Sequence, residues 1–212
     1  MTVSLQAYLD NLEEETYELM VGTGDSNALS YGFTKKRAVH PGVSGQMIPP
    51  PMAPQKWVEL MEQEPDMSKK RMVYIHIPFC SHICLYCGFF QNFINEDREQ
   101  RYVERLLKEL EMAKGDKMLQ AKPMQCVFFG GGTPSAISPT NITKVLQKLK
   151  ECIPLTNDCE ITMEARIYDL QKERIEAWFA NGVNRVSIGV QSFDTKIRQA
   201  SGRLDTKETV ME

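Results

Sequence analysis

Hydrophobic and polar positions change their period several times along this chain of 212 residues. From residue 71 onward, short apolar runs at 72–77, 124–129, 160–164 and 185–191 alternate with stretches whose apolar residues recur every three or four positions. The runs predict β-strands. The stretches predict helices at 96–114, from Pro139 onward with Ser138 as its cap, at 170–180, and from Thr206 onward. Four β–α units in a row indicate parallel strands with right-handed crossovers, and therefore an α/β fold.

The predicted strands separate their side chains into an apolar face and a polar face, because successive residues of a strand point to opposite sides. A closed barrel normally fills its interior with branched apolar side chains. A polar interior instead predicts a cavity that holds a polar cofactor. Only residues 126–129 show no clear separation. The polar face collects Tyr74, His76, Glu160, Thr162, Glu164, Arg185, Ser187, Gly189 and Gln191.

The length of the repeating part bounds the architecture. A closed eight-stranded barrel takes about 250 residues, whereas residues 71–212 supply only four β–α units. We therefore expect part of a barrel, with the chain stopping inside its last predicted helix. Residues 1–70 predict a separate extension: an amphipathic helix at 5–21, a segment rich in Gly, Pro and Ser at 22–54, and a short helix at 56–63.

Composition limits the classes of partner and the cellular compartment that we expect. The 25 Lys and Arg nearly balance the 28 Asp and Glu, so the chain offers no polyanion-binding surface and nucleic acid is not expected. Neither a signal peptide nor a run of about 18 apolar residues is present, so we expect no membrane partner and a cytoplasmic location. Thiols are kept reduced there, which favours metal binding over disulfides for clustered cysteines.

Cys80, Cys84 and Cys87 form a C-x3-C-x2-C pattern directly after the first predicted strand. Thiolates this close can hold one iron–sulfur cluster, since cysteine sulfur is the usual ligand of iron in such clusters. Three thiolates would leave one iron of a [4Fe–4S] cluster open for chemistry. Zinc is the alternative, but a structural zinc site usually takes four ligands from two pairs, and no second pair exists.

A glycine run and three polar residues complete the candidate site. Residues 130–134 (GGGTP) follow the second predicted strand, where bare glycines let the backbone approach a ligand; a tight strand-to-helix turn is the alternative. Glu164 and Gln191 end the third and fourth predicted strands, which is where barrel enzymes keep their sites. Together with Arg203 they could bind hydroxyls and a carboxylate.

Other candidate ligands have simpler explanations. Cys126, Cys152 and Cys159 are expected to be small core residues. His40 and Met47, together with Met52, lie in the irregular N-terminal stretch and could ligate a haem iron.

With these motifs in order, the chain resembles the radical S-adenosylmethionine (SAM) superfamily from about residue 71 to 203. It is most similar to the branch of oxygen-independent coproporphyrinogen III dehydrogenase (HemN). The markers are YIHIPFC at 74–80, GGGTPS at 130–135 and GVNRVSIGVQSF at 182–193. The resemblance implies a partial (β/α) TIM-like barrel of the radical SAM type, comprising the first four β–α units behind an irregular, partly helical extension.

The resemblance also implies the roles of individual residues. Cys80, Cys84 and Cys87 match the ligands of the [4Fe–4S] cluster. Tyr74, Gly131 and Glu164 match positions that line the SAM on the open iron, and a second SAM is implied by another set. That second set comprises Tyr86, Gly132, Thr133, Gln191 and Arg203.

Three features are most similar to the anaerobic haem-degrading radical SAM methyltransferases (HutW/ChuW type): CGFFQN at 87–92, the long lead-in, and GRLD at 202–205. The third strand ends in EARIY at 164–168, where much of the branch has EANP. The resemblance implies methylation of haem with ring opening and iron release.

Two alternatives stay open: oxidative decarboxylation of coproporphyrinogen III, and haem trafficking of the HemW type without turnover. A tetrapyrrole and an electron donor such as flavodoxin or ferredoxin are the implied partners, and no turnover is expected of these 212 residues alone.

Overall fold

The computed structural model describes residues 11–21, 48–87 and 92–212. The chain divides into two compact units, Met1–Pro50 and Pro51–Glu212. In the first unit, helix α2 (Glu14–Val21) confirms the later part of the helix predicted at 5–21; residues 11–13 are not helical, and residues 5–10 lie outside the described residues. The proposed boundary at residue 70 stays a prediction.

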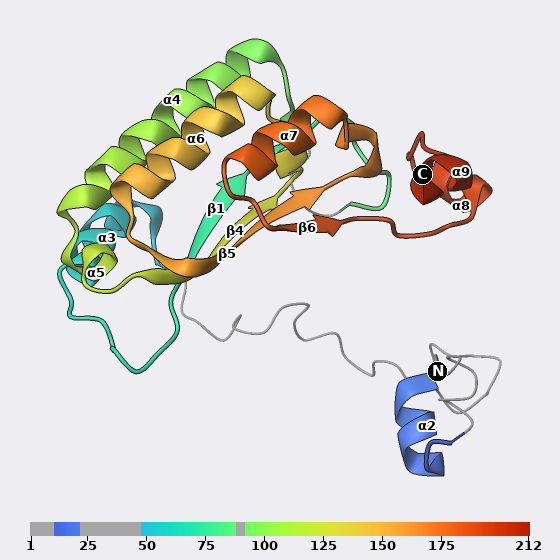
Figure 1. The fold of residues 1–212 in the computed structure, drawn as a ribbon, viewed down its shortest axis with the longest axis horizontal. Helices are drawn as coiled ribbons and strands as arrows, with labels where there is room; N and C mark the ends of the chain where they lie inside the picture. Colours follow the sequence, from blue (N-terminus) through green and yellow to red (C-terminus); the bar gives the residue numbers. More distant parts are fainter. Residues whose placement is uncertain (1–10, 22–47, 88–91) are drawn as a thin grey trace. The chain divides into compact units, whose positions relative to one another are not determined.

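The second unit is built on a parallel sheet of four strands in the order β1-β4-β5-β6 (Figure 1). The strands are β1 (Met72–Ile77), β4 (Met124–Gly131), β5 (Leu155–Ala165) and β6 (Arg185–Ile188). Spatial order follows chain order, so each strand is joined to its neighbour by a crossover on the same face. This confirms the predicted α/β fold with four β–α units.

Helices α4 (Glu96–Met112), α6 (Pro139–Cys152) and α7 (Lys172–Ala180) cover one face of this sheet (Figure 1). Helices α4 and α6 begin at side-chain caps: the Asn95 side chain accepts from the Arg98 N–H, and the Ser138 side chain accepts from the Asn141 N–H. The shorter helices are α3 (Ala53–Met61), α5 (Lys117–Gln120), α8 (Thr195–Ala200) and α9 (Lys207–Met211), with four 3-10 turns at Pro50–Met52, Ala113–Gly115, Pro134–Ala136 and Ile167–Asp169. Helices α5 and α8 are absent from the prediction because four to six residues carry too little periodicity to detect.

We expect the apolar strand faces to meet the helices, and this is confirmed for β1 and β5, whereas in β6 Val186 and Ile188 are 39% and 44% exposed. Ile75, Ile77, Ile161 and Met163 are buried in one core cluster. In β4, Val127 and Phe129 join that core whereas Cys126 is half-buried on the opposite face, so this strand does separate its faces. The pattern is hidden in the sequence because Cys126 and Phe128 are themselves apolar. Cys126 is therefore not the core residue that was predicted, although Cys152 and Cys159 are buried.

Three predicted strands have different ends, and β4 continues two residues beyond its predicted end, to Gly131. Strand β5 begins five residues earlier than predicted, because Leu155 pairs with Met124 before the register shifts. Strand β6 ends at Ile188 rather than at residue 191: the Val190 N–H donates to Ile188 and the Ser192 N–H to Val190, at 3.0 and 2.9 Å. Gln191 has a φ of +67°. It therefore lies in a tight turn after the strand, not on it.

Glu99 joins α4 to the start of α6. It is buried, and its Oε1 accepts hydrogen bonds from the Ser138 N–H (2.9 Å), the Ser138 hydroxyl (2.6 Å) and the Asn141 amide (2.8 Å). The two N-terminal helix ends are thereby fixed relative to each other, and the loop that precedes α6 is held with them.

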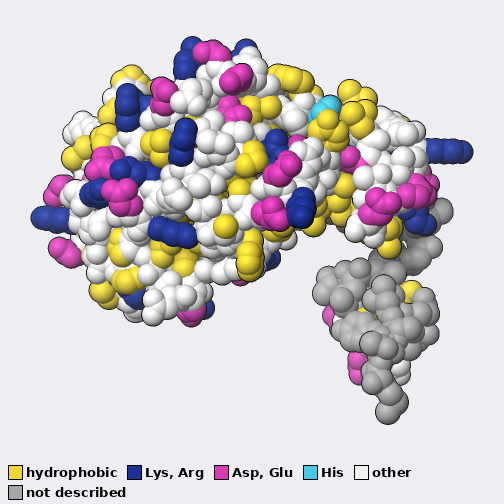
Figure 2. Space-filling view, turned by 45° about the horizontal axis from the view of Figure 1, so that its top comes forward, with side chains coloured by type: hydrophobic (Ala, Val, Ile, Leu, Met, Phe, Trp, Pro, Cys, Tyr) yellow, Lys and Arg dark blue, Asp and Glu magenta, His cyan; other side chains and the backbone are white. Residues whose placement is uncertain are grey.

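The outer surface carries both signs of charge. On the face that Figure 2 shows, Lys and Arg are interspersed with Asp and Glu rather than gathered in one basic patch. Within the described ranges, no helix is long and apolar enough to cross a bilayer.

Candidate functional site

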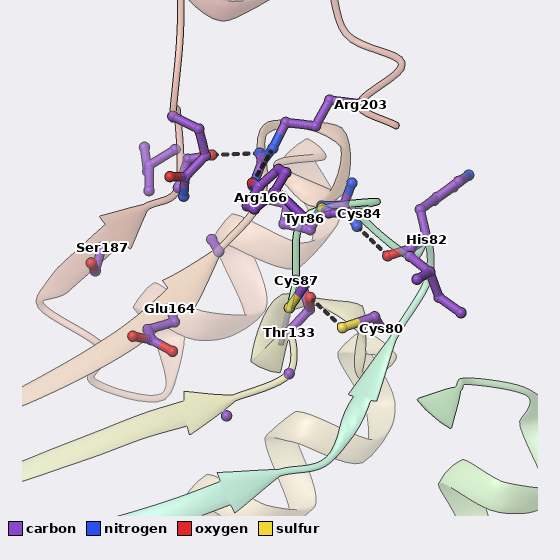
Figure 3. A pocket seen from close by; sticks show the side chains of 17 residues that line it. Cys80, His82, Cys84, Tyr86, Cys87, Thr133, Glu164, Arg166, Ser187 and Arg203 are labelled. Carbon is purple, nitrogen blue, oxygen red and sulfur yellow. Dashed lines mark hydrogen bonds between the residues drawn. The ribbon is translucent and has the colours of Figure 1, made fainter. Parts of the chain in front are cut away.

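Segments far apart in the sequence meet in a cavity of about 470 Å³ at the carboxyl ends of the strands (Figure 3). In a parallel sheet these ends share one edge, so the loops that follow each strand gather there. Ten of the eleven residues predicted for the site line the cavity; only Tyr74 does not. The ten are Cys80, Cys84, Cys87, Tyr86, Gly131, Gly132, Thr133, Glu164, Gln191 and Arg203.

The cysteine loop leaves β1 through β2 (Phe79–Cys80), a short strand paired with β3 (Asn92–Phe93). Cys80 and Cys84 are buried and Cys87 is half-buried. The Cys87 N–H donates to the Cys84 carbonyl at 3.1 Å, and the Thr133 hydroxyl donates to the Cys80 sulfur at 3.2 Å. Burial raises the pKa of the Cys80 thiol, while this hydrogen bond and the charge of Arg166 oppose the rise. All six cysteines of the chain lie in described residues, and none forms a disulfide.

The spread of the three thiols discriminates between the candidate metals. Three thiolates around one tetrahedral zinc stand about 3.8 Å apart, from Zn–S bonds of roughly 2.3 Å. Over the described part of the chain, the one set of three such ligand atoms within 4.8 Å of each other is Glu111, Glu151 and Cys152, not the cysteine loop. The loop therefore fits a cluster, whose cysteines bind different irons, better than it fits zinc. The Glu111 set is exposed apart from Cys152 and is neutralised by Lys114 and Lys148.

The glycine loop packs directly against the start of the cysteine loop. The Gly132 N–H donates to the Ile77 carbonyl and the Thr133 N–H to the Phe79 carbonyl, both at 2.7 Å. A Cβ at Gly132 would lie 2.6 Å from the Phe79 oxygen, and Gly131 has a φ of +119° that side chains rarely adopt. Close backbone packing thus requires these two glycines, whatever ligand they also meet.

Glu164 and Tyr74 lie next to each other at the inner end of the site. A Cβ on Gly130 would come within 3.0 Å of the Tyr74 ring and 3.1 Å of Glu164 Oε2. Burial raises the pKa of Glu164, and a hydrogen bond from the Gly131 backbone opposes the rise. Burial, and then the Glu164 charge, raise the pKa of Tyr74, whose hydroxyl is 3.0 Å from His76 Nδ1.

Arg203 connects the end of the described chain to the cysteine loop. It is buried; its Nε donates to the Tyr86 hydroxyl at 3.0 Å and its Nη1 to the Gly189 carbonyl at 2.6 Å. The Leu85 N–H donates to the Ser201 carbonyl at 3.0 Å, which fixes the same two segments to each other. The cation predicted from GRLD therefore stands in the cavity wall, facing Tyr86.

Arg166 and a buried hydroxyl–carboxylate network were not predicted. Arg166 is 7% exposed, and its Nη1 donates to the His82 carbonyl at 2.6 Å (Figure 3). Asp169 is buried and accepts from the Ser135 and Ser81 hydroxyls at 3.0 and 3.3 Å. The sequence did carry a signal, because Arg166 stands where EARIY departs from the EANP of much of the branch.

The haem-ligand alternative gains no support. His40 and Met47 lie outside the described residues, and Met52 is exposed at the end of the first 3-10 turn.

Comparisons with known proteins identify the family of this chain. Residues 74–212 match the model of the Radical SAM superfamily. Anaerobilin synthase of Escherichia coli O157:H7 is 40% identical over 179 residues, which cover 84% of this chain and 40% of that protein. Heme chaperone HemW of Escherichia coli K12 is 37% identical over 133 residues, 62% of this chain and 35% of that protein.

Among solved structures, the radical SAM enzyme coproporphyrinogen III oxidase (HemN) of Escherichia coli superimposes with a TM-score of 0.65 at 23% identity. The superposition covers 74% of this chain and 35% of that one, and it shows the same fold. The chain thus spans about two fifths or less of the length of these proteins.

Proposed function

We propose that this chain, which belongs to the radical SAM superfamily, is the cofactor-binding part of an enzyme that methylates haem, opens its ring and releases the iron. The finer assignments are made residue by residue: Cys80, Cys84 and Cys87 hold a [4Fe–4S] cluster, and the cavity beside them takes SAM. A reducing cytoplasm and a small electron-transfer protein suit such a cluster.

One observation supports haem breakdown over the alternatives: the extent of the match to anaerobilin synthase. That match covers 84% of the chain, whereas residues 71–212 are 142 of 212, or 67%. It therefore includes a sizeable part of the lead-in before residue 71. The matched 62% to HemW is no longer than the core alone. The core motifs are common to several tetrapyrrole proteins, so similarity outside the core carries more information about the substrate.

The donor set around the cysteines fits the two cofactors. When bound, a [4Fe–4S] cluster with one open iron supplies the electron that cleaves SAM reductively. The chain's own residues bind these two cofactors and orient them. Glu164, whose carboxylate is half-buried, accepts hydroxyl hydrogen bonds, and Arg203 offers a buried cation to a carboxylate. Burial of Cys80 and Cys84 and the closely packed glycine loop exclude water from this side of the cavity.

We further propose that the cavity takes a second SAM. Tyr86, Gly132, Thr133, Gln191 and Arg203 form its wall, and each lines the cavity beside the first set. Because Arg203 donates to the Tyr86 hydroxyl, binding at this wall depends on both segments, the cysteine loop and the one after α8.

An anaerobic assay of the full-length protein tests the proposal. The protein is supplied with reductant, SAM and haem, and the Soret band and product mass are followed. Loss of the Soret band with a methylated linear tetrapyrrole is expected. Unchanged haem in a preparation that contains its cluster and cleaves SAM would refute the proposal. Vinyl formation from coproporphyrinogen III would favour decarboxylation, and tight haem binding without turnover would favour trafficking.

The cluster ligands have a matched control within the chain. Cys84→Ala should abolish the visible absorbance of the cluster, whereas Cys126→Ala should retain it, since Cys126 faces Glu160 away from the cavity. Equal cluster content in both variants would contradict the ligand assignment.

A further inference from the structure

Arg166 is a buried cation without a buried anion beside it. Its side chain follows β5, lines the cavity and is 7% exposed. Across the described ranges no carboxylate lies within 4.0 Å of its guanidinium, and its Nε is buried without a hydrogen-bond partner. Burying an unpaired charge is costly in a protein interior. An anion bound in the cavity would compensate a charge that no carboxylate of the described residues pairs with.

The position of Arg166 indicates which anion this is. Its Nη1 donates to the carbonyl of His82, which lies between Cys80 and Cys84 in the cysteine loop. Its backbone N–H donates to the Ser135 hydroxyl at 3.2 Å, next to the glycine loop. The Arg166 backbone is thus fixed beside the glycine loop and its guanidinium beside the cysteine loop, where its charge acts on Cys80. A cysteine-ligated cluster carries net negative charge, and this charge increases on reduction.

We propose that Arg166 is a positioning residue for the cluster: it fixes the cysteine loop through the His82 carbonyl and places its positive charge near the thiolates of the cluster ligands. This inference rests on the proposed cluster site, not on the substrate. The cation stabilises the reduced cluster more than the oxidised one, because the reduced form has one more electron. Arg166 therefore makes the cluster easier to reduce.

Arg203 differs from Arg166 in this respect. Its Nε donates to the side-chain hydroxyl of Tyr86 in the cysteine loop, and its Nη1 donates to the Gly189 carbonyl after β6. Arg174, also near the glycine loop, donates to the Ser135 and Ile137 carbonyls and does not line the cavity. Among these three arginines, Arg166 is the one that donates to a backbone carbonyl of the cysteine loop, between Cys80 and Cys84.

The test is a redox titration of the reconstituted full-length protein, followed by the EPR signal of the reduced cluster, with iron and sulfide measured in each sample. Arg166→Gln removes the charge, and Arg166→Lys keeps it. Arg185→Gln is the matched control, since Arg185 is exposed on β6 and pairs with Glu160 away from the cavity. We expect Arg166→Gln to lower the equilibrium constant for reduction of the cluster about tenfold. This corresponds to a negative shift of the midpoint potential of about 59 mV for one electron. Arg166→Lys should shift it less, and Arg185→Gln not at all.

Each outcome of the titration supports or overturns the inference about Arg166. An unshifted midpoint in Arg166→Gln with full iron content would overturn the inference. If Arg166→Gln assembles no cluster but Arg166→Lys does, the need for a cation is supported; if neither does, Arg166 is merely structural and the inference fails. A wild-type protein that binds no cluster would instead refute the proposed function. None of these measurements depends on haem turnover.

Discussion

Replacing Asp205 by Asn would leave the Arg198 guanidinium charged and uncompensated inside the protein. The two side chains are 0% and 4% exposed, and Arg198 Nη2 lies 2.6 Å from Asp205 Oδ2. Arg198 also donates to the backbone carbonyls of Val190, Ser192 and Asp205. This buried pair thus holds the turn after β6 and the segment that carries Arg203.

The cost follows from the geometry of the pair. Removing one partner of a buried ion pair typically costs about 3–5 kcal/mol. Asn retains a hydrogen-bond acceptor at the same place, so we expect about 2–3 kcal/mol for the charge alone. The pair belongs to one short segment, and the loss should therefore appear as local opening of residues 195–205. About 2 kcal/mol corresponds to a roughly 30-fold larger opening equilibrium.

Hydrogen exchange read by mass spectrometry measures this opening. The N–H groups of Ser201, Gly202 and Arg203 are hydrogen-bonded within the segment and should exchange roughly 30-fold faster in Asp205→Asn. Asp194→Asn is the control: it is the same substitution at the cap of α8, where Asn caps as well as Asp. Equal exchange in the two variants would refute the reasoning that the buried charge stabilises this segment.

Two further predictions concern stability, and one concerns cluster content. Glu99→Ala should lower the free energy of unfolding by about 3 kcal/mol in urea titrations, because three donors at the start of α6 lose a buried acceptor; an effect below 0.5 kcal/mol would contradict this. Gly132→Ala should reduce cluster content, measured as iron per protein, because its Cβ would overlap the Phe79 carbonyl; full iron content would show that the loops can separate. Burial raises the pKa of Tyr102 to about 12, and its hydroxyl donates to the His76 carbonyl. The stability that depends on its neutral form is therefore fully present below pH 10 and lost between pH 10 and 12. Tyr102→Phe should flatten that decline in thermal melts, and an unchanged decline would argue against it.

Local sequence patterns predicted most of the fold. Helices α4 and α6 were predicted from their apolar stripes and caps, because both signals depend on residues close together in the chain. Strand β1 has its predicted bounds. The end of β6 was missed because the turn at Gln191 depends on backbone hydrogen bonds that no side-chain pattern records.

The sequence alone determined the α/β class and the residues of the site, since motif spacing and strand ends place Cys80, Glu164 and Arg203 at one edge of the sheet. Only the tertiary structure decided how these residues are held. Arg166, 84 residues from the His82 carbonyl that it contacts, and the Arg198–Asp205 pair both act through burial. Burial is a property of the whole packed molecule, because each charge is removed from water by segments that the sequence keeps far apart.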